Sequence, residues 1–176
     1  TAQVSILTNF SSTVQTTNVN CAGHADGEAT VYTSGTGTGW NYTWRDQNNA
    51  VVRQTLNANT DVLVAGPGNY TVVVQEVVAG QACSDTLSFT LTEPAPFVLT
   101  RIPVDTTICI DGSAILATTA IGGTLPYTFS WPNGLYGPGP HTVSPVTDQV
   151  YTLSASDANG CTVVPITFTV QVRDSL

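Results

Sequence analysis

Residues 122–131 read GGTLPYTFSW, and this stretch decides the fold. A similar stretch, residues 35–44, occurs earlier in the chain. Aligning the two stretches pairs Trp44 with Trp131, Tyr42 with Phe129, Trp40 with Tyr127 and Gly35 with Gly122. Successive side chains of a strand alternate between its two faces, so the three aromatic residues of each stretch point to one side. Each stretch therefore predicts a strand that fills the middle of a sandwich core.

This repetition also predicts the domain organisation. Trp44 and Trp131 are 87 residues apart, and Cys21 and Cys109 are 88 apart (131 − 44 and 109 − 21). This period is close to half of the 176 residues and is a common size for an immunoglobulin-like sandwich. Residues 93–96 read EPAP, and two prolines in three residues cannot sit in a central strand. We expect two domains, 1–95 and 96–176.

Composition favours β structure throughout. The chain has 15 Gly and 10 Pro, is rich in Thr and Val, and contains no Met. Strong helix formers nowhere make a long run. The predicted fold class is all-β, with two tandem immunoglobulin-like antiparallel β-sandwiches.

Charge and hydropathy exclude two classes of partner. The net charge is −8 with only four cationic residues, which would repel nucleic acid. No apolar run approaches the roughly 20 residues of a membrane-spanning helix, so membrane insertion is not expected. No signal peptide precedes Thr1, and we expect a mature or excised piece.

The four cysteines predict disulfides rather than zinc ligands, because their spacings are wide and no Cys-x-x-Cys pair occurs. Three pairings are open. The repeat favours Cys21 with Cys83 and Cys109 with Cys161, one bridge inside each unit, which implies an oxidising compartment.

The N-terminal segment allows two interpretations. Residues 1–19 hold Val4, Ile6 and Val14 among polar residues, which suits one or two strands. The segment is either the first strand of its own sandwich or an assembly arm that adds to the sheet of a neighbouring molecule.

Candidate chemical groups are few. The histidines His24 and His141 both lie in turn-rich segments, and His24 with Asp26 is a weak metal pair beside the alternative of a solvated loop histidine. Asp148, Asp157 and Asn159 could supply oxygens to calcium, although Asp and Asn in turns more often bond their own backbone. We expect no cofactor, and no carboxylate pair of a glycosidase is favoured.

The aromatic stretches could in principle stack on sugars, but their alternation and the flanking cysteines favour core filling. Tyr32 and Tyr136 lie outside these alternating stretches, so the pattern does not predict that they are buried. They are the first tyrosines to test for surface contacts.

Each unit contains a series of short motifs, which together span residues 20–172. In the second unit they are Gly122-Gly123, Pro126-Tyr127, Trp131, Ser144-Pro145, Tyr151-Thr152-Leu153 and the ending Asp157-Ala158-Asn159-Gly160-Cys161. In the first unit they are Cys21, Asp26-Gly27, Trp44, Gly68, Tyr70-Thr71-Val72 and Glu93-Pro94. The second unit resembles the immunoglobulin-like and PKD-like modules of large secreted surface proteins in Bacteroidetes. The first resembles the related SprB-type repeat of gliding adhesins.

This resemblance implies an exported, non-catalytic module, typically repeated in an adhesin, a surface fibre or the stalk of a secreted enzyme. Three triplets also resemble the acceptor pattern for O-glycosylation in Bacteroidetes, which places glycans at Thr86, Thr106 or Ser175.

We therefore expect a non-catalytic structural or adhesive module on a bacterial cell surface, which contacts a protein or glycan ligand through loops or sheet edges. One alternative is a self-assembling filament subunit, joined to copies of itself through the N-terminal strand or a sheet edge. Another is a carbohydrate-binding accessory region of a secreted hydrolase.

Overall fold

The computed structural model describes residues 10–76, 83–102 and 105–174. The chain divides into two compact units, Thr1–Glu93 and Pro94–Leu176. The division falls two residues before the boundary expected from the prolines. The described residues form strands and turns, and no helix among them could cross a membrane.

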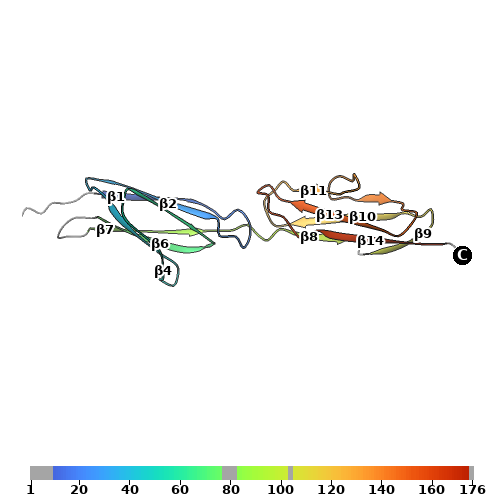
Figure 1. Cartoon of the computed structure of the whole chain (residues 1–176), viewed down its shortest axis with the longest axis horizontal. Coiled ribbons are helices and arrows are strands. Elements are labelled where there is room, and N and C mark those ends of the chain that lie inside the picture. Colours follow the sequence, from blue (N-terminus) through green and yellow to red (C-terminus); the bar gives the residue numbers. More distant parts are fainter. Residues whose placement is uncertain (1–9, 77–82, 103–104, 175–176) are drawn as a thin grey trace, which may run out of the picture. The chain divides into compact units, whose positions relative to one another are not determined.

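The first unit is a sandwich of two sheets, visible in Figure 1 as β1 and β2 facing β6 and β7. Its strands are β1 (Phe10–Thr17), β2 (Gly27–Gly35), β3 (Trp40–Arg45), β4 (Val51–Ala58), β5 (Thr60–Ala65), β6 (Gly68–Glu76) and β7 (Ser84–Leu91). One sheet has the order β1-β2-β5 and the other the order β4-β3-β6-β7. Every strand pairing within them is antiparallel.

Strand β1 belongs to its own sandwich. It pairs with β2 over its whole length, from Phe10 opposite Gly35 to Thr17 opposite Glu28. The assembly-arm hypothesis is therefore wrong for residues 10–17, because that backbone edge of β1 is already hydrogen-bonded within the unit. Residues 1–9 lie outside the described residues.

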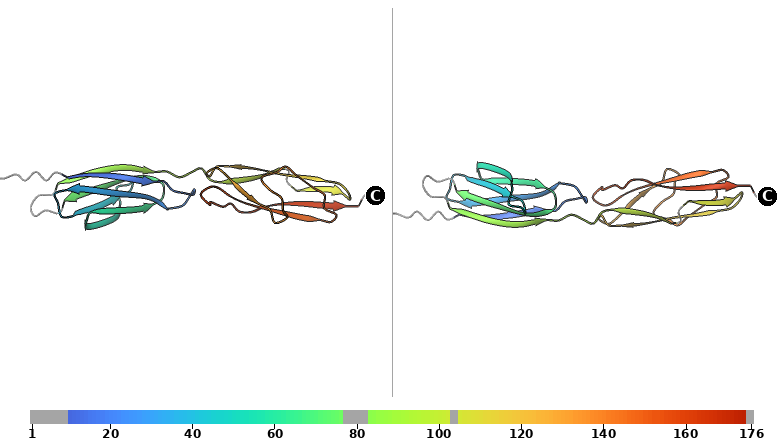
Figure 2. Two further views of the ribbon diagram at one scale, coloured as in Figure 1. Left: turned by 90° about the horizontal axis from the view of Figure 1, so that it is seen from above. Right: turned by 90° about the horizontal axis from the view of Figure 1, so that it is seen from below.

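The second unit is also a sandwich of two sheets. Its strands are β8 (Val98–Ile102), β9 (Thr106–Cys109), β10 (Ala114–Ile121), β11 (Thr128–Ser130), β12 (His141–Val143), β13 (Gln149–Ser156) and β14 (Ile166–Arg173). The sheet orders are β12-β10-β8 and β11-β13-β14-β9. Within each unit the strands run roughly along a common direction (Figure 2). The pairing of β14 with β9 is parallel, and the other strand pairings of this unit are antiparallel, as predicted.

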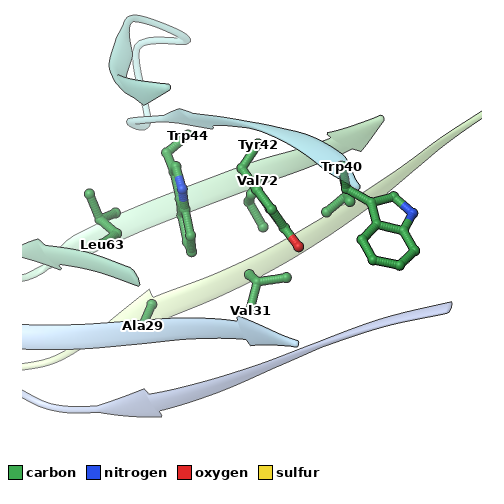
Figure 3. Packing of buried hydrophobic residues seen from close by; sticks show 8 residues of the cluster. Ala29, Val31, Trp40, Tyr42, Trp44, Leu63 and Val72 are labelled. Carbon is green, nitrogen blue, oxygen red and sulfur yellow. The ribbon is translucent and has the colours of Figure 1, made fainter. Parts of the chain in front are cut away.

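The aromatic stretch of the first unit fills its core, as predicted. Trp40, Tyr42 and Trp44 are buried, whereas the intervening residues of β3 are only half-buried. In Figure 3, Tyr42 and Trp44 extend from β3 toward Ala29 and Val31 on the facing sheet. The period-two placement of the rings thus presents them to the second layer of the sandwich.

The corresponding stretch of the second unit is a shorter strand with a similar role. Trp131 is buried 5.6 Å from the ring of Phe168, and Phe129 packs half-buried against the same cluster. Tyr127 stacks on Phe97 at 4.9 Å, and its hydroxyl donates to the Gly122 carbonyl at 2.6 Å. The core role of Phe129 and Trp131 is confirmed.

Gly122 and Gly123 are required by their backbone and by their neighbours. Their φ angles are +72° and +59°, a region that L side chains rarely adopt. A Cβ at Gly122 would collide with the Pro96 carbonyl, and one at Gly123 would lie 2.7 Å from Asp157 Oδ2. The glycine pair therefore lets the chain turn closely against two other segments of the unit.

Candidate functional site

Cys109 and Cys161 lie at opposite ends of β14. Cys109 pairs with Arg173 at the end of that strand, whereas Cys161 precedes its first residue, Ile166. The 8 residues of β14 span about 25 Å, while a disulfide needs Cα atoms within about 7 Å. Cys109 has a free, exposed thiol, and Cys161 is disulfide-bonded. The predicted bridge between Cys109 and Cys161 is therefore wrong.

Cys21 and Cys83 are likewise at opposite ends of a strand, β7. Cys83 directly precedes β7, and its carbonyl accepts the Glu76 N–H at 3.1 Å. Cys21 follows Val19, whose N–H donates to the Thr92 carbonyl beyond the other end of β7 at 2.9 Å. Cys21 is disulfide-bonded, but this separation excludes the predicted partner Cys83. The error was to assume one bridge inside each repeat.

The Asp157 carboxylate organises the turn that follows β13. Its Oδ1 accepts the N–H groups of Asn159 and Cys161 at 2.9 Å each, and its Oδ2 accepts the Thr124 N–H at 2.8 Å. Burial raises the pKa of Asp157, but these hydrogen bonds outweigh it and hold the pKa below its ordinary value. The motif at residues 157–161 is thereby joined to the Gly-Gly segment.

The calcium candidates do not converge. Asp148 directly precedes β13 and Asp157 directly follows it, so the 8 residues of that strand separate them. Asp148 Oδ1 instead accepts the Val172 N–H at 2.7 Å and lies 3.7 Å from Arg173 Nη1. In the described part of the chain, no three His, Cys, Asp or Glu residues are grouped to hold a metal. Asp148, Asp157 and Asn159 thus do not form the shared oxygen cage that calcium needs.

A buried carboxylate in the first unit connects its two sheets, and the sequence did not reveal it. Asp61 of β5 is 4% exposed and accepts the Trp44 indole N–H at 2.7 Å. The Arg53 guanidinium of β4 binds it with both Nε and Nη2, the shorter distance being 2.8 Å. Burial raises the pKa of Asp61, but the hydrogen bonds from Arg53 and Trp44 outweigh it and lower the pKa overall.

The histidines and their neighbours serve local structure. The His24 N–H donates to the Cys21 carbonyl at 3.0 Å. The Asp26 carboxylate accepts the backbone and side-chain N–H groups of Asn20 at 3.1 and 3.0 Å, and these bonds lower the pKa of Asp26. His141 is half-buried with its ring edge-on to Trp131 at 5.5 Å. Asp26 is thus engaged in fixing a turn.

The expected surface residues differ in accessibility. Thr86 is exposed on β7, Thr106 is half-buried on β9, and Ser175 lies outside the described residues. Glycosylation stays a prediction, and accessibility favours Thr86. Tyr32 and Tyr136 are both exposed, on β2 and in the segment between β11 and β12.

A groove of about 470 Å³ lies on the first unit between the β3–β4 turn and strands β6 and β7. It is lined by Asp46, Gln47, Asn49, Asn69, Tyr70, Thr71, Ser88, Phe89 and Thr90. Asp46 Oδ1 holds the turn by accepting the N–H groups of Asn48 and Ala50 at 2.9 Å each. The rings of Tyr70 and Phe89 stack at 5.7 Å against the core, so the groove presents aromatic surface together with amide and hydroxyl groups.

No family model matches the chain, and no curated protein sequence matches it. Similar solved structures include the I-band fragment I67–I69 of titin, with 16% identity and a TM-score of 0.52 over 97% of this chain and 67% of that chain. The fibronectin(III)-like modules of Clostridium thermocellum CbhA match with 11% identity and a TM-score of 0.37 over 92% of this chain and 95% of that chain.

The likeness to the titin fragment shows the fold alone, because the identity is low. It confirms the predicted fold class: the chain consists of tandem immunoglobulin-like β-sandwiches.

Proposed function

We propose that the chain is a non-catalytic structural and adhesive module of an extracellular bacterial surface protein or fibre. The observation that carries this proposal is the structural use of two buried carboxylates, Asp61 and Asp157. Asp61 connects the two sheets of the first unit, and Asp157 anchors a turn of the second. These two carboxylates thus hold the sandwiches together through hydrogen bonds and an ion pair.

Two further observations support an extracellular surface protein. Cys21 and Cys161 are disulfide-bonded, and such bonds persist mainly in oxidising compartments. The two motifs that carry the resemblance to Bacteroidetes surface modules also contact each other. Thr124 beside the Gly-Gly pair donates its N–H to Asp157 and accepts the Ala158 N–H at 2.9 Å. The two motifs therefore form one hydrogen-bonded joint of the second unit.

Adhesion is tested with beads that carry the chain in a flow chamber. The surfaces are glass, cellulose, mucin and a layer of the same chain, and the measured quantity is the fraction of beads retained under shear. Beads that carry the reduced and carboxymethylated chain are the control, because breaking the disulfide alters the fold while the amino-acid sequence stays the same. We expect greater retention of the native beads on at least one surface. Equal retention on all four would refute the adhesive function.

A second candidate function, carbohydrate binding, is favoured by the groove beside the β3–β4 turn, which combines aromatic rings with amides and hydroxyls. Its amides and hydroxyls offer both donors and acceptors, which match the hydroxyl groups of a neutral sugar. Asp46 is the one charged group in the lining, so an anionic ligand would have no cationic partner there. Asn69 and Thr90 are already preorganised by a hydrogen bond of 2.7 Å.

This candidate is tested on an array of neutral oligosaccharides with the native chain and Asn69→Ala. The substitution removes up to two hydrogen bonds of about 1 kcal/mol each, so we expect affinity to fall roughly tenfold or more. Asn133→Ala, which changes a loop amide of the second unit, is the matched control. Unchanged binding by Asn69→Ala, or no sugar bound by the native chain, would contradict carbohydrate recognition in the groove.

A further inference from the structure

Strand β13 is paired along its two edges to different extents. Residues 149–153 pair with β14 on one side, whereas β11 on the other side pairs with residues 154–156. Strand β11 ends at Ser130, and Pro132 soon follows it, a residue that has no N–H with which to continue a ladder. Within residues 105–174, no strand pairs with residues 149–153 on the β11 side.

The backbone groups of Val150 and Thr152 face this open edge. Alternate residues of a strand direct their N–H and C=O groups to opposite edges. The Thr169 N–H of β14 donates to Asp105 at 2.9 Å, on the β9 side, and so points away from β13. Val150 lies opposite Thr169, so its N–H and C=O face the β11 side, as do those of Thr152. The Val150 carbonyl accepts the side-chain amide of Gln149 at 3.1 Å, where a neighbouring strand could donate instead.

The sequence of this edge favours pairing with a further strand. Residues 149–153 read QVYTL and contain good strand formers, without a charged residue or a proline. Charged residues and prolines are the usual means by which edge strands avoid pairing with other chains. The edge strands β4 and β8, by comparison, contain Arg53 and Arg101.

A groove of about 500 Å³ lies beside the same part of β13. Gln149 and Tyr151 of β13 line it, together with Asn133 and Leu135 of the segment that follows β11. The groove is therefore on the β11 side of β13. Its lining contains no charged residue, and part of it is apolar, as at Leu135 and Val143.

Tyr151 gives the groove a hydrogen-bond donor. Its side chain is 8% exposed, and its hydroxyl makes no hydrogen bond to any residue that the structure describes. Buried hydroxyl groups normally have a partner. Burial raises the pKa of the Tyr151 phenol, so the phenol keeps its proton at neutral pH and can donate it to an oxygen of a ligand.

These features select an extended polypeptide as the occupant. The groups of Val150 and Thr152 recur every two residues, about 6.8 Å apart, and another peptide strand presents its own donors and acceptors at that spacing. The uncharged lining favours uncharged side chains, because a charge placed there would have no partner. The net charge of −8 opposes contact between two copies of this chain, which favours a segment of a different protein.

We propose that an extended, uncharged segment of a partner protein adds to β13 beside residues 149–153 and places a side chain in the groove lined by Leu135, Val143 and Tyr151. The proposal rests on the adhesive function and names the kind of partner and the strand that binds it.

The first test is amide hydrogen exchange of the full chain, followed residue by residue by NMR. The N–H groups of Val150 and Thr152 should exchange at least about tenfold faster than those of Tyr151 and Leu153, which face β14. All four residues belong to one strand, so the comparison is internal. Equal exchange rates would show that the edge is already paired and would overturn the proposal.

The second test is titration of the full chain with the peptide acetyl-TVTVT-amide, followed by the amide NMR signals of Val150 and Thr152. We expect a dissociation constant of about 0.1–1 mM, because a short peptide loses much of its binding energy in becoming ordered. The matched control is the same peptide with every backbone nitrogen methylated. It keeps the side chains but cannot donate to β13, so it should bind at least about tenfold more weakly.

A pair of variants tests the groove. Tyr151→Phe removes the hydroxyl and keeps the ring, so the peptide should bind about fivefold more weakly. Tyr136→Phe makes the same change at an exposed tyrosine outside the groove and should bind like the native chain. Well-dispersed amide spectra verify that both variants fold. Equal binding by the two variants would contradict the role of the groove.

The remaining outcomes also decide the proposal. No peptide binding, or equal binding of the methylated peptide, overturns it. Shifts of the Val150 and Thr152 signals that depend on chain concentration without peptide would assign the edge to a second copy and overturn it as well. If no peptide binds while the native beads are still retained under shear, the adhesive function stands and this edge is not its site.

Discussion

Replacing Asp61 by alanine removes the group that joins the two sheets of the first unit. The substitution leaves the buried Trp44 N–H without its acceptor at 2.7 Å, a loss of about 1–3 kcal/mol. It also removes the ion pair with Arg53. Because the Arg53 side chain is 47% exposed and can be rehydrated, that loss should be about 1 kcal/mol and not the 3–5 typical of a fully buried pair. We expect Asp61→Ala to lower the free energy of unfolding of the first unit by about 3 kcal/mol.

The assay is urea unfolding followed by hydrogen-exchange mass spectrometry, which separates peptides of the first unit from those of the second. Asp61→Asn should lose less, about 1–2 kcal/mol, because its amide oxygen can still accept the Trp44 N–H. Asp148→Ala is the control, since its pair with Arg173 is long, both side chains are 58% exposed, and water can replace its exposed hydrogen bond to the Val172 N–H; its effect should stay at about 1 kcal/mol or less. If Asp61→Ala lowered the stability of the first unit by no more than Asp148→Ala lowers that of the second, the inter-sheet role of Asp61 would be refuted.

The remaining predictions concern pH, backbone and thiol chemistry. Because the folded-state pKa of Asp61 is lowered, its stabilisation is complete above the unfolded-state pKa of about 3.9 and is lost as the pH falls through the folded-state pKa. The free energy of unfolding of the first unit should therefore depend less steeply on pH in the acid range in Asp61→Asn than in the native chain. An unchanged pH dependence would contradict this. Gly122→Ala should destabilise the second unit by more than Gly134→Ala in thermal unfolding, because both have positive φ but only Gly122 also meets the Pro96 carbonyl. Equal losses of stability in the two variants would show that the close approach of Gly122 to the Pro96 carbonyl does not matter. Maleimide should label Cys109 in the native chain, and intact mass should show one label fewer in Cys109→Ser; the same number of labels would contradict the free thiol.

The sandwich cores followed from local pattern. A side-chain period of two is a property of any strand, so the alternating Trp40, Tyr42 and Trp44 indicated a buried face before any partner strand was known. The similar stretch at Phe129 and Trp131 carried the same information for the second unit. Residues that pack in this way are predictable because burial depends on their own spacing and hydrophobicity.

The predicted cysteine pairs do not form and the calcium candidates do not converge, for the same reason. Cys109 and Cys161, like Asp148 and Asp157, are separated by the length of a whole strand, and sequence distance does not show which end of a sheet a residue occupies. The bonds of Asp157 to the Asn159 and Cys161 N–H groups are local turn bonds of the kind that the sequence favoured over calcium, whereas its bond to Thr124 could not be predicted, because Thr124 is 33 residues away.

The sequence by itself determined that the chain is a tandem pair of all-β sandwiches with aromatic centres, since periodicity and repetition are local properties. Only the tertiary structure decided which polar groups meet, namely Asp61 with Trp44 and Arg53, and Asp157 with Thr124. It also decided which apolar residues stay outside. Strand β10 has apolar residues at both odd and even positions, and only its register with β8 and β12 assigns Ile115 and Ile121 to the solvent side. These outcomes depend on strand pairing between distant segments, which local spacing cannot specify.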